Sequence, residues 1–522
     1  MEEKKRKFCS IFMTAFILWS TLVCGCSLFA TEKPPVSRDK NSTSGANVTG
    51  TTPQLVKAPF YDSTEGLSDI MAPKDFDWKQ FSGITLNFIL ENNVYANVLA
   101  KEADQFTKFT GIKIKIHALD FDTMTEKINL DFISKTGKYQ IVYVDPYQTL
   151  TRFSNKLVDL NSFNQDSSLP HIPGGVEDFF HGQLDVDSYF LNRDKLYAIP
   201  FDSPTMILFY RKDILEKYNR QFKEEKGYDI EPGSINFTWE RYYEVVQWMN
   251  ENVPKSEVKY GTGHQAKQHN SLFCDFSNIL AAYGGNYFAG RDVGSIGVEN
   301  PGVPAINSAE AIKALSMYKK ILKAADPRSV TWDWLGLAEA FKAGDLALMP
   351  NWNEYSAMIE NPLKSRVRGK VGYCLLPYGP ARSANIFGGS GIGINSDSHS
   401  REQQAAWLFI LWVTSPQTEL FVFKYPEGGD IPLRKSVYTV NEIKEAMSHS
   451  EEASARFPTL LPMKAVLTAW ESANTYQRPK TEKWPQVEKV ITEELYKMIT
   501  GGAGAEDTAK SITARMNAVL EQ

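Results

Sequence analysis

Short strand-like stretches alternate with longer helical stretches between residues 83 and 145, and this alternation constrains the fold more than any other feature of the chain. Apolar residues alternate with polar ones in the first two strand-like stretches and recur at helical spacing in the helical ones. The strand-like stretches are 84–88, 112–116 and 140–145, and the helical ones are 94–109 and 124–132. Strands joined in this way by helices run parallel, so the order predicts an α/β fold with a doubly wound sheet.

Three polar or aromatic side chains lie close to the ends of the predicted strands. Asn92 follows the first strand, and Asp145 and Tyr147 lie at the end of the third. Ligands of such sheets bind at the carboxyl ends of the strands, so we expect these side chains to lie at one rim and to contact a ligand. A carboxylate beside Pro146 is also typical of a turn, and this structural alternative stays open for Asp145.

A second apolar stretch, Met206–Tyr210, follows two prolines and has the composition of a strand buried on both faces. Pro200 and Pro204 fix their own φ angles and favour extended backbone in the residue before each. Asp202 lies between the prolines, where a purely structural strand needs no carboxylate. We therefore predict that the chain leaves one lobe for another here and that Asp202 contacts a ligand. A core strand after a proline-rich loop is the alternative.

A short apolar stretch that ends at Pro350 is followed by Trp352, which has asparagines on both sides, and by Glu354. This order offers one flat apolar face surrounded by hydrogen-bonding groups. The structural alternative is that Trp352 packs at the start of a helix. Further on, Gly389 lies in a glycine-rich stretch that lacks the Lys-Ser/Thr pair of a phosphate loop, and it suits a close backbone approach or a hinge.

A polar loop contains His264, Gln268 and His269. No carboxylate or cysteine lies at ligand spacing beside the histidines, so we expect neither a metal site nor a cofactor. Gln268 is either a partner of ligand hydroxyl groups or a solvated loop residue. Cys274 and Cys374 both lie in apolar surroundings, and a disulfide or two buried thiols are both compatible with the sequence.

The size and charge of the chain exclude some classes of function. A chain of 522 residues with 43% hydrophobic and 23% charged residues is soluble, globular and long enough for two lobes or more. A net charge of −5 argues against nucleic acid as a partner, because phosphate binding needs a basic face. Eleven tryptophans are more than core packing usually needs, and they suit a site that stacks on flat faces.

The amino terminus predicts export and a lipid anchor. Basic residues 4–7 precede an apolar stretch at 8–23, which has the length of a signal-peptide core. Gly25 before Cys26 resembles the bacterial lipobox, whose cysteine receives lipid. We therefore expect a protein anchored to the cell membrane through Cys26, on the extracytoplasmic face, with a polar tether above it. A cleaved signal peptide with incidental cysteines is the alternative.

Several stretches resemble the extracellular solute-binding proteins of carbohydrate ABC importers. They are FTKFTGIKIKI at 106–116, KYQIVYVDPY at 138–147, LYAIPF at 196–201 and YRKD at 210–213. The resemblance implies the periplasmic-binding-protein-like fold, in which two α/β lobes with doubly wound sheets close on a sugar around a hinge. With the leader, it implies a signal peptide at 1–25, a disordered tether at 26–75, a first lobe at 76–203 and 387–440, a second lobe at 204–386 and closing helices of the second lobe at 441–522.

The resemblance also implies roles for single residues. Trp352 matches the family's sugar-stacking tryptophan, and Asp430 and Arg434 lie in a loop near the cleft mouth. The full set of expected ligand-binding residues is Asn92, Asp145, Tyr147, Asp202, Gln268, Trp352, Glu354, Gly389, Asp430, Arg434 and Trp484.

These observations predict a monomeric, non-enzymatic protein that binds a sugar or oligosaccharide and delivers it to the permease subunits of an ABC importer. One alternative is a surface glycosidase with two carboxylates, although no two acids are paired locally in the sequence. A peptide-binding or oligoamine-binding protein is the other.

Overall fold

The computed structural model describes residues 54–289, 294–425, 428, 430–448 and 457–522. All of them belong to one unit of the chain, Pro53–Gln522. The predicted signal peptide and the predicted lipidation site at Cys26 lie outside the described residues, so both stay predictions.

The first lobe is built on a five-stranded sheet with the order β4-β3-β5-β12-β6. Its strands are β3 (Thr85–Glu91), β4 (Lys113–Leu119), β5 (Ile141–Val144), β6 (Ile199–Asp202) and β12 (Ser390–Ile394). The strand β3 pairs in parallel with β4 and with β5, which confirms the predicted parallel core. The late strand β12 runs antiparallel between β5 and β6.

Two crossover helices position the carboxyl edge of this sheet. The helix α1 (Val94–Thr110) begins at Asn93, whose side chain accepts a hydrogen bond from the backbone N–H of Ala96, and it ends at Gly111 with φ 73°. The helix α2 (Phe121–Ser134) begins in the same way at Asp120. Both helices therefore start directly above the ends of β3 and β4, where the sequence predicted a ligand.

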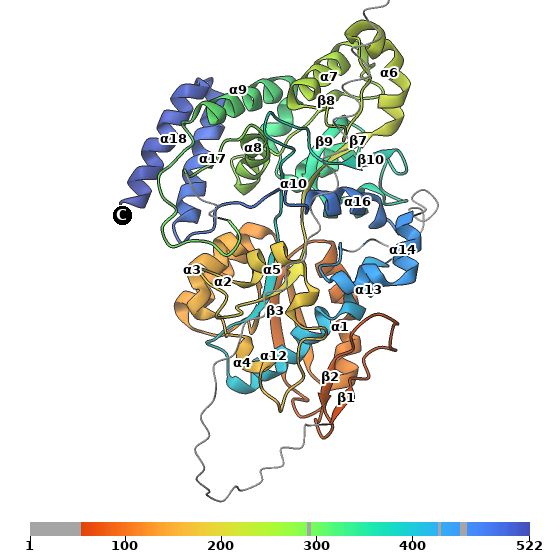
Figure 1. Ribbon diagram of the computed structural model, residues 1–522, viewed down its shortest axis with the longest axis vertical. Helices are drawn as coiled ribbons and strands as arrows, with labels where there is room; N and C mark the ends of the chain where they lie inside the picture. Colours follow the sequence, from red (N-terminus) through yellow and green to blue (C-terminus); the bar gives the residue numbers. More distant parts are fainter. Residues whose placement is uncertain (1–53, 290–293, 426–427, 429, 449–456) are drawn as a thin grey trace, which may run out of the picture. The chain divides into compact units, whose positions relative to one another are not determined.

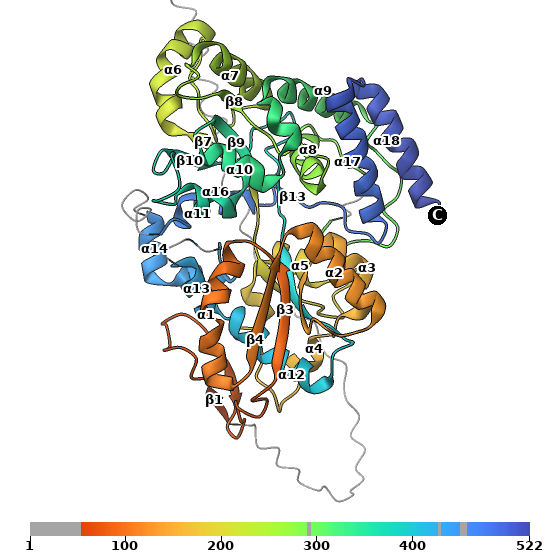
Figure 2. The ribbon, with the colours of Figure 1, turned by 180° about the vertical axis from the view of Figure 1, so that it is seen from behind.

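The second lobe is built on a four-stranded sheet with the order β10-β7-β9-β8. Its strands are β7 (Met206–Arg211), β8 (Tyr260–Thr262), β9 (Leu346–Trp352) and β10 (Val371–Cys374). The first four residues of β7 are buried, as predicted for this stretch. Figures 1 and 2 show the helices of this lobe around the sheet. They include α6 (Lys212–Lys226), α7 (Trp239–Asn252), α8 (Asn270–Ala282), α9 (Ala309–Ala324) and α10 (Trp334–Lys342).

The chain passes from one sheet to the other at two places that lie side by side. The first passage is the short segment Ser203–Thr205 between β6 and β7, and the second leads from β11 (Asn385–Ile386) to β12. The backbone N–H of Gly388 donates a hydrogen bond of 2.6 Å to the carbonyl of Pro204. The two passages therefore form one connection between the lobes.

Residues 54–75 differ from the prediction of a disordered tether. They contain two short antiparallel strands, β1 (Leu55–Lys57) and β2 (Met71–Pro73). The ring of Phe60 in this segment stacks on Phe106 of α1, with 5.8 Å between ring centroids, and also contacts Trp78. Apolar side chains of this polar segment thus pack on the first lobe. The average composition of the segment did not indicate this packing.

The remaining elements pack on the two sheets and on their helices. The short ones are η1 (Pro146–Leu150), α3 (Thr151–Phe153), η2 (Ser154–Lys156), α4 (Asn161–Asn164), η3 (Val176–Asp178), α5 (His181–Ser188), η4 (Pro327–Thr331), η5 (Asn353–Tyr355), α11 (Ser356–Ile359), η6 (Lys435–Thr439) and β13 (Thr475–Tyr476). The longer ones are α12 (Ser400–Val413), α13 (Pro416–Phe423), α14 (Asn441–Ser448), α16 (Leu460–Ala469), α17 (Trp484–Gly501) and α18 (Ala505–Leu520). For example, α12 packs against β12 and β3, and α17 packs against α8.

Within the described ranges, no single helix is long and apolar enough to cross a membrane. The pair α12 and α13 reaches that length and composition only together, with a bend of 53° between them. Cys274 is buried and Cys374 is half-buried, and both are free thiols.

Candidate ligand-binding cleft

A cavity of about 610 Å³ lies between the two lobes. The first lobe contributes the end of β3 and the starts of α1 and α2, and the second lobe contributes the start of α10 and the turn after β9. A smaller cavity of about 40 Å³ shares Glu91, Phe121, Trp334 and Glu354 with it and extends toward the passage between the lobes. We call the two cavities together the cleft.

Aromatic rings from both lobes face each other across the cleft. The ring of Phe121 meets the ring of Trp334 edge to face, with 5.8 Å between centroids and 84° between planes. The ring of His269 lies 4.7 Å from that of Trp334, and its Nε2 lies 3.5 Å from Oδ2 of Asp122 in the first lobe. These side chains give the cleft flat apolar faces near a polar rim.

Two carboxylates, Glu91 and Glu354, line both cavities of the cleft. Among the residues that the structure describes, neither side chain has a hydrogen-bond or ion-pair partner. Desolvation, and then the charges of Asp202 and Asp145, raise the pKa of Glu91 to about 8. Desolvation, followed by the charges of Asp202 and Glu91, raises the pKa of Glu354 well above its ordinary value. The cleft thus holds two acceptor groups that gain from a hydrogen-bonding ligand.

A second pair of acids, Asp202 and Asp430, is buried in the first lobe near these carboxylates. Asn93 Nδ2 and Tyr143 Oη each donate a hydrogen bond of 2.8 Å to Oδ2 of Asp202. The backbone N–H and Oγ of Ser203 donate to Asp430, also at 2.8 Å. Desolvation raises the pKa of both acids. Neither residue lines the cleft, so their hydrogen bonds serve to hold the passage between the lobes.

Asp145 lines the small cavity, and it also caps the short helix η1. Its Oδ1 accepts hydrogen bonds from the backbone N–H groups of Tyr147 and Gln148. The guanidinium of Arg478 lies over the ring of Tyr147 at 3.9 Å and donates a hydrogen bond of 3.1 Å to the carbonyl of Gly388. Tyr147 itself is buried beneath Arg478 and does not line the cleft.

The other predicted site residues fall into three groups. Asn92, Trp352 and Gly389 line the cleft, whereas Gln268 lines a third cavity of about 600 Å³ that adjoins it at Phe121. Trp352 is only 6% exposed, so most of its ring is packed in the core.

Arg434 and Trp484 lie outside all three cavities. Arg434 is fully buried, donates hydrogen bonds to the carbonyls of Thr414 and Pro173, and stacks on Phe179 at 3.8 Å. Trp484 is fully buried, and its ring centroid lies 5.3 Å from that of Tyr287. Both side chains are enclosed in the interior of a lobe, where they contribute to its stability. Neither lines the cleft.

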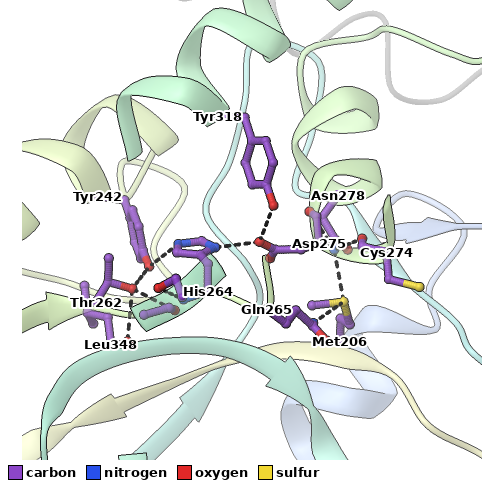
Figure 3. Close-up of polar contacts among 12 residues, drawn as sticks. Met206, Tyr242, Thr262, His264, Gln265, Cys274, Asp275, Asn278, Tyr318 and Leu348 are labelled. Atoms are coloured by element: carbon purple, nitrogen blue, oxygen red, sulfur yellow. Dashed lines mark hydrogen bonds and ion pairs between the residues drawn. The ribbon is translucent and has the colours of Figure 1, made fainter. Parts of the chain in front are cut away.

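The histidine of the polar loop that lies deepest, His264, belongs to a buried network in the second lobe (Figure 3). Its Nδ1 lies 2.7 Å from Oδ2 of Asp275, which also accepts a hydrogen bond of 2.9 Å from Oη of Tyr318. Its Nε2 lies 3.2 Å from Oη of Tyr242. This network links three helices and the end of β8, so we assign it to the stability of the lobe.

Among the cleft residues absent from the sequence-based set are Glu91, Phe121, Trp334 and Arg478. Glu91 could have been found by extending the first predicted strand. That strand was predicted to end at residue 88, whereas β3 continues to Glu91. A signal also existed for Trp334, which directly follows the helix cap Asp333. No local pattern indicated Phe121 or Arg478.

A sequence profile described as bacterial extracellular solute-binding protein matches residues 92–419. A probable ABC transporter-binding protein of Deinococcus radiodurans is 30% identical over 216 residues, which make up 40% of this chain and 46% of that relative. The chain therefore spans less than half of the length of that relative. The erythritol/L-threitol-binding protein of Mycolicibacterium smegmatis is 22% identical over 379 residues, which make up 70% of this chain and 73% of that relative.

Among solved structures, maltose-bound MalE3 of T. maritima is similar with a TM-score of 0.68 and 22% identity. The match covers 84% of this chain and 100% of that one. At this identity the likeness concerns the fold, and it agrees with the two α/β lobes described above.

Proposed function

Because the chain belongs to the bacterial extracellular solute-binding proteins, we propose that it binds a sugar or polyol in the cleft and delivers it to an ABC importer. The observation that carries this proposal is that two carboxylates without a partner among the described residues, Glu91 and Glu354, line the same cavity as the aromatic rings of Trp334 and Phe121. Sugars and polyols present this combination of hydroxyl donors and apolar C–H faces.

The chemistry of such a complex follows from the geometry. Hydroxyl groups of the ligand donate hydrogen bonds to Glu91 and Glu354, and where these acids are ionised such charge-assisted bonds are stronger than neutral ones. The ring of Trp334 covers a C–H face of the ligand. Several such contacts together support micromolar affinity, on the order of −8 kcal/mol.

The names of two similar proteins agree with this ligand class. One binds erythritol and L-threitol, and the other was solved with maltose. The family consists of binding proteins, so we propose that the bound carbohydrate is released unchanged. The glycosidase alternative predicts instead that an oligosaccharide is shortened on incubation with the protein.

A thermal-shift screen tests the proposed function. The panel contains sugars, polyols, peptides and polyamines, and chromatography of each carbohydrate after incubation monitors cleavage. We expect the melting temperature to rise only with members of the carbohydrate and polyol set, without cleavage. A rise with neutral peptides alone, or the appearance of shorter oligosaccharides, contradicts the proposal.

We also propose that Cys26 carries the lipid that holds the protein, as a monomer, at the outer face of the membrane. The proposal is supported by Gly25 before it and by the basic and apolar leader. Cys26→Ser should shift the protein from the membrane fraction to the soluble fraction, whereas the control Cys24→Ser should not. Continued labelling of the Cys26→Ser protein with a radioactive fatty acid contradicts the assignment.

A further inference from the structure

We propose that the ligand of the cleft carries a positively charged nitrogen beside its hydroxyl groups, as an amino sugar does, and that Glu91 and Glu354 select for it. This inference rests on the proposed function, since it names the class of carbohydrate that the same cleft takes. Three observations on the cleft carry it: the engaged cations, the unpaired acids, and the aromatic and polar groups around them.

The cations that line the cleft are already engaged or lie at its rim. Lys267 Nζ lies 3.0 Å from Oδ2 of Asp333, and Lys342 Nζ lies 2.5 Å from Oε2 of Glu339. The remaining cationic or titratable basic groups are His269 beside Asp122, Lys101 over the ring of Tyr425, Lys364 exposed at the rim, and Arg478 over the ring of Tyr147. None of these groups forms an ion pair with Glu91 or Glu354 among the described residues.

The other acids near Glu91 and Glu354 do not neutralise the two glutamates but repel them. Asp120 and Asp122 lie at the start of α2, and Asp202 and Asp430 lie beneath the cleft. When ionised, every one of these neighbours carries the same sign of charge as the two glutamates. A neutral polyol offers hydrogen bonds but leaves this repulsion in place, whereas an ammonium group removes it. The two glutamates come from different lobes, so one cation between them also draws the lobes together.

The aromatic rings give a second, independent reason for a cation. Trp334 and Phe121 line both cavities together with the two glutamates, and Tyr355 lines the larger one. The faces of such rings attract ammonium groups, and more strongly where water is excluded.

Arg478 gives the reason for hydroxyl groups on the same ligand. It lines the small cavity, is 5% exposed, and its Nε has no hydrogen-bond partner among the residues that the structure describes. A buried donor of this kind requires an acceptor, such as a hydroxyl oxygen of the ligand. The small cavity thus presents the two acceptors together with a donor, which fits an aminated carbohydrate better than a simple amine.

The test compares pairs of compounds that differ only by an amine in place of a hydroxyl group. Glucose with glucosamine, and cellotriose with the glucosamine trimer of the same linkage, are titrated calorimetrically at about pH 6 and at about pH 8. The amine is charged at the lower pH, and Glu91, whose pKa is raised to about 8, ionises toward the higher one. Spermidine serves as an amine without hydroxyl groups. The variants Glu91→Gln and Glu354→Gln keep the shape of each side chain but remove its charge, and Asp104→Asn, exposed on α1, is the control.

We expect the aminated member of a pair to bind roughly tenfold more tightly than its hydroxyl counterpart. The preference should fall in both glutamate variants and with added salt, and it should persist in Asp104→Asn. Equal or tighter binding of the neutral member overturns the inference and leaves the proposed function intact. Binding of spermidine alone overturns the proposed function, and the absence of binding by every compound at millimolar concentration contradicts both.

Discussion

The side chain of Glu91 has opposite effects on stability and on ligand binding. Its position at the end of β3 puts its side chain in the cleft without a hydrogen-bond partner among the described residues, so both of its oxygens can bind a ligand. The same position places its charge near other acids, which raise its pKa together with desolvation. The unliganded protein is therefore destabilised by a group that the proposed ligand needs, as is common at functional sites.

Glu91→Gln should stabilise the unliganded protein in a pH-dependent way. The pKa of Glu91 is raised from 4.5 to about 8, so the folded protein binds more protons than the unfolded chain in this interval and loses stability as pH rises through it. Thermal melts should show a higher melting temperature for the variant at about pH 8 and little difference near pH 4.5. Asp104→Asn is the control, and an equal gain at both pH values contradicts the pKa argument.

Trp352→Ala should cost about 3–5 kcal/mol of unfolding free energy, as is typical for truncation of a buried aromatic side chain. The sequence alone predicts little loss of stability, because polar residues flank this tryptophan, but the ring is only 6% exposed. Chemical denaturation of the unliganded variant measures the cost. A loss below about 1 kcal/mol would restore the prediction that the ring is mainly a stacking platform.

Single residues of the site were predictable where they follow a predicted strand. Asn92, Asp145 and Glu354 lie in the cleft, as their places after strands indicated. The same reasoning could not place Arg434 or Trp484, because whether a long side chain points to a cavity or to the core depends on elements far away in sequence. Their roles in ligand binding therefore have no support from their positions.

At the scale of the elements, the passage between the lobes positions the segments that line the small cavity of the cleft. Gly389 has φ 61°, and a side chain there would overlap Phe387 and Asp187 of the adjoining segments. The glycine thus permits a close approach between β12 and α5, in addition to a left-handed backbone.

Gly389→Ala should lower the unfolding free energy more than a matched substitution without steric overlap. Gly227 at the end of α6 has φ 83° and no neighbour within 4 Å of an added Cβ, so Gly227→Ala measures the backbone term alone, about 1–2 kcal/mol. Overpacking at Gly389 should add roughly 1–3 kcal/mol to that cost. Equal costs for the two variants in denaturant titrations would show that the passage tolerates a side chain.

Helices and parallel strands were predictable because their signals are local. Asn93 and Gly111 mark the two ends of α1, and the alternating residues of β4 are visible in the sequence. The antiparallel insertion of β12 between β5 and β6 was not predictable, since its partners lie roughly 190 to 250 residues earlier and glycines carry no periodic pattern. The strands β1 and β2 were missed because a few buried side chains make this segment ordered, whereas its average composition is that of a disordered tether.

At the scale of the whole molecule, ligand binding should bring the lobes together. The two unpaired glutamates and the facing rings come from different lobes, so a ligand between them favours the closed arrangement over more open ones. Small-angle scattering should show a smaller radius of gyration at saturating ligand than without it. An unchanged radius at saturation contradicts closure around the ligand.

The central claim is that a carbohydrate or polyol binds in the cleft between the lobes, and calorimetric titration of matched tryptophan variants tests it most directly. The titrant is the tightest-binding compound of the thermal-shift screen. Trp334 lines the cleft, whereas Trp332, two residues earlier and equally half-buried, lies beneath Arg328 and lines neither cavity of the cleft. We predict that Trp334→Ala weakens binding by roughly 1–3 kcal/mol, near ten- to a hundredfold, and that Trp332→Ala leaves it unchanged. Wild-type affinity in Trp334→Ala, or an equal loss in both variants, would contradict the account.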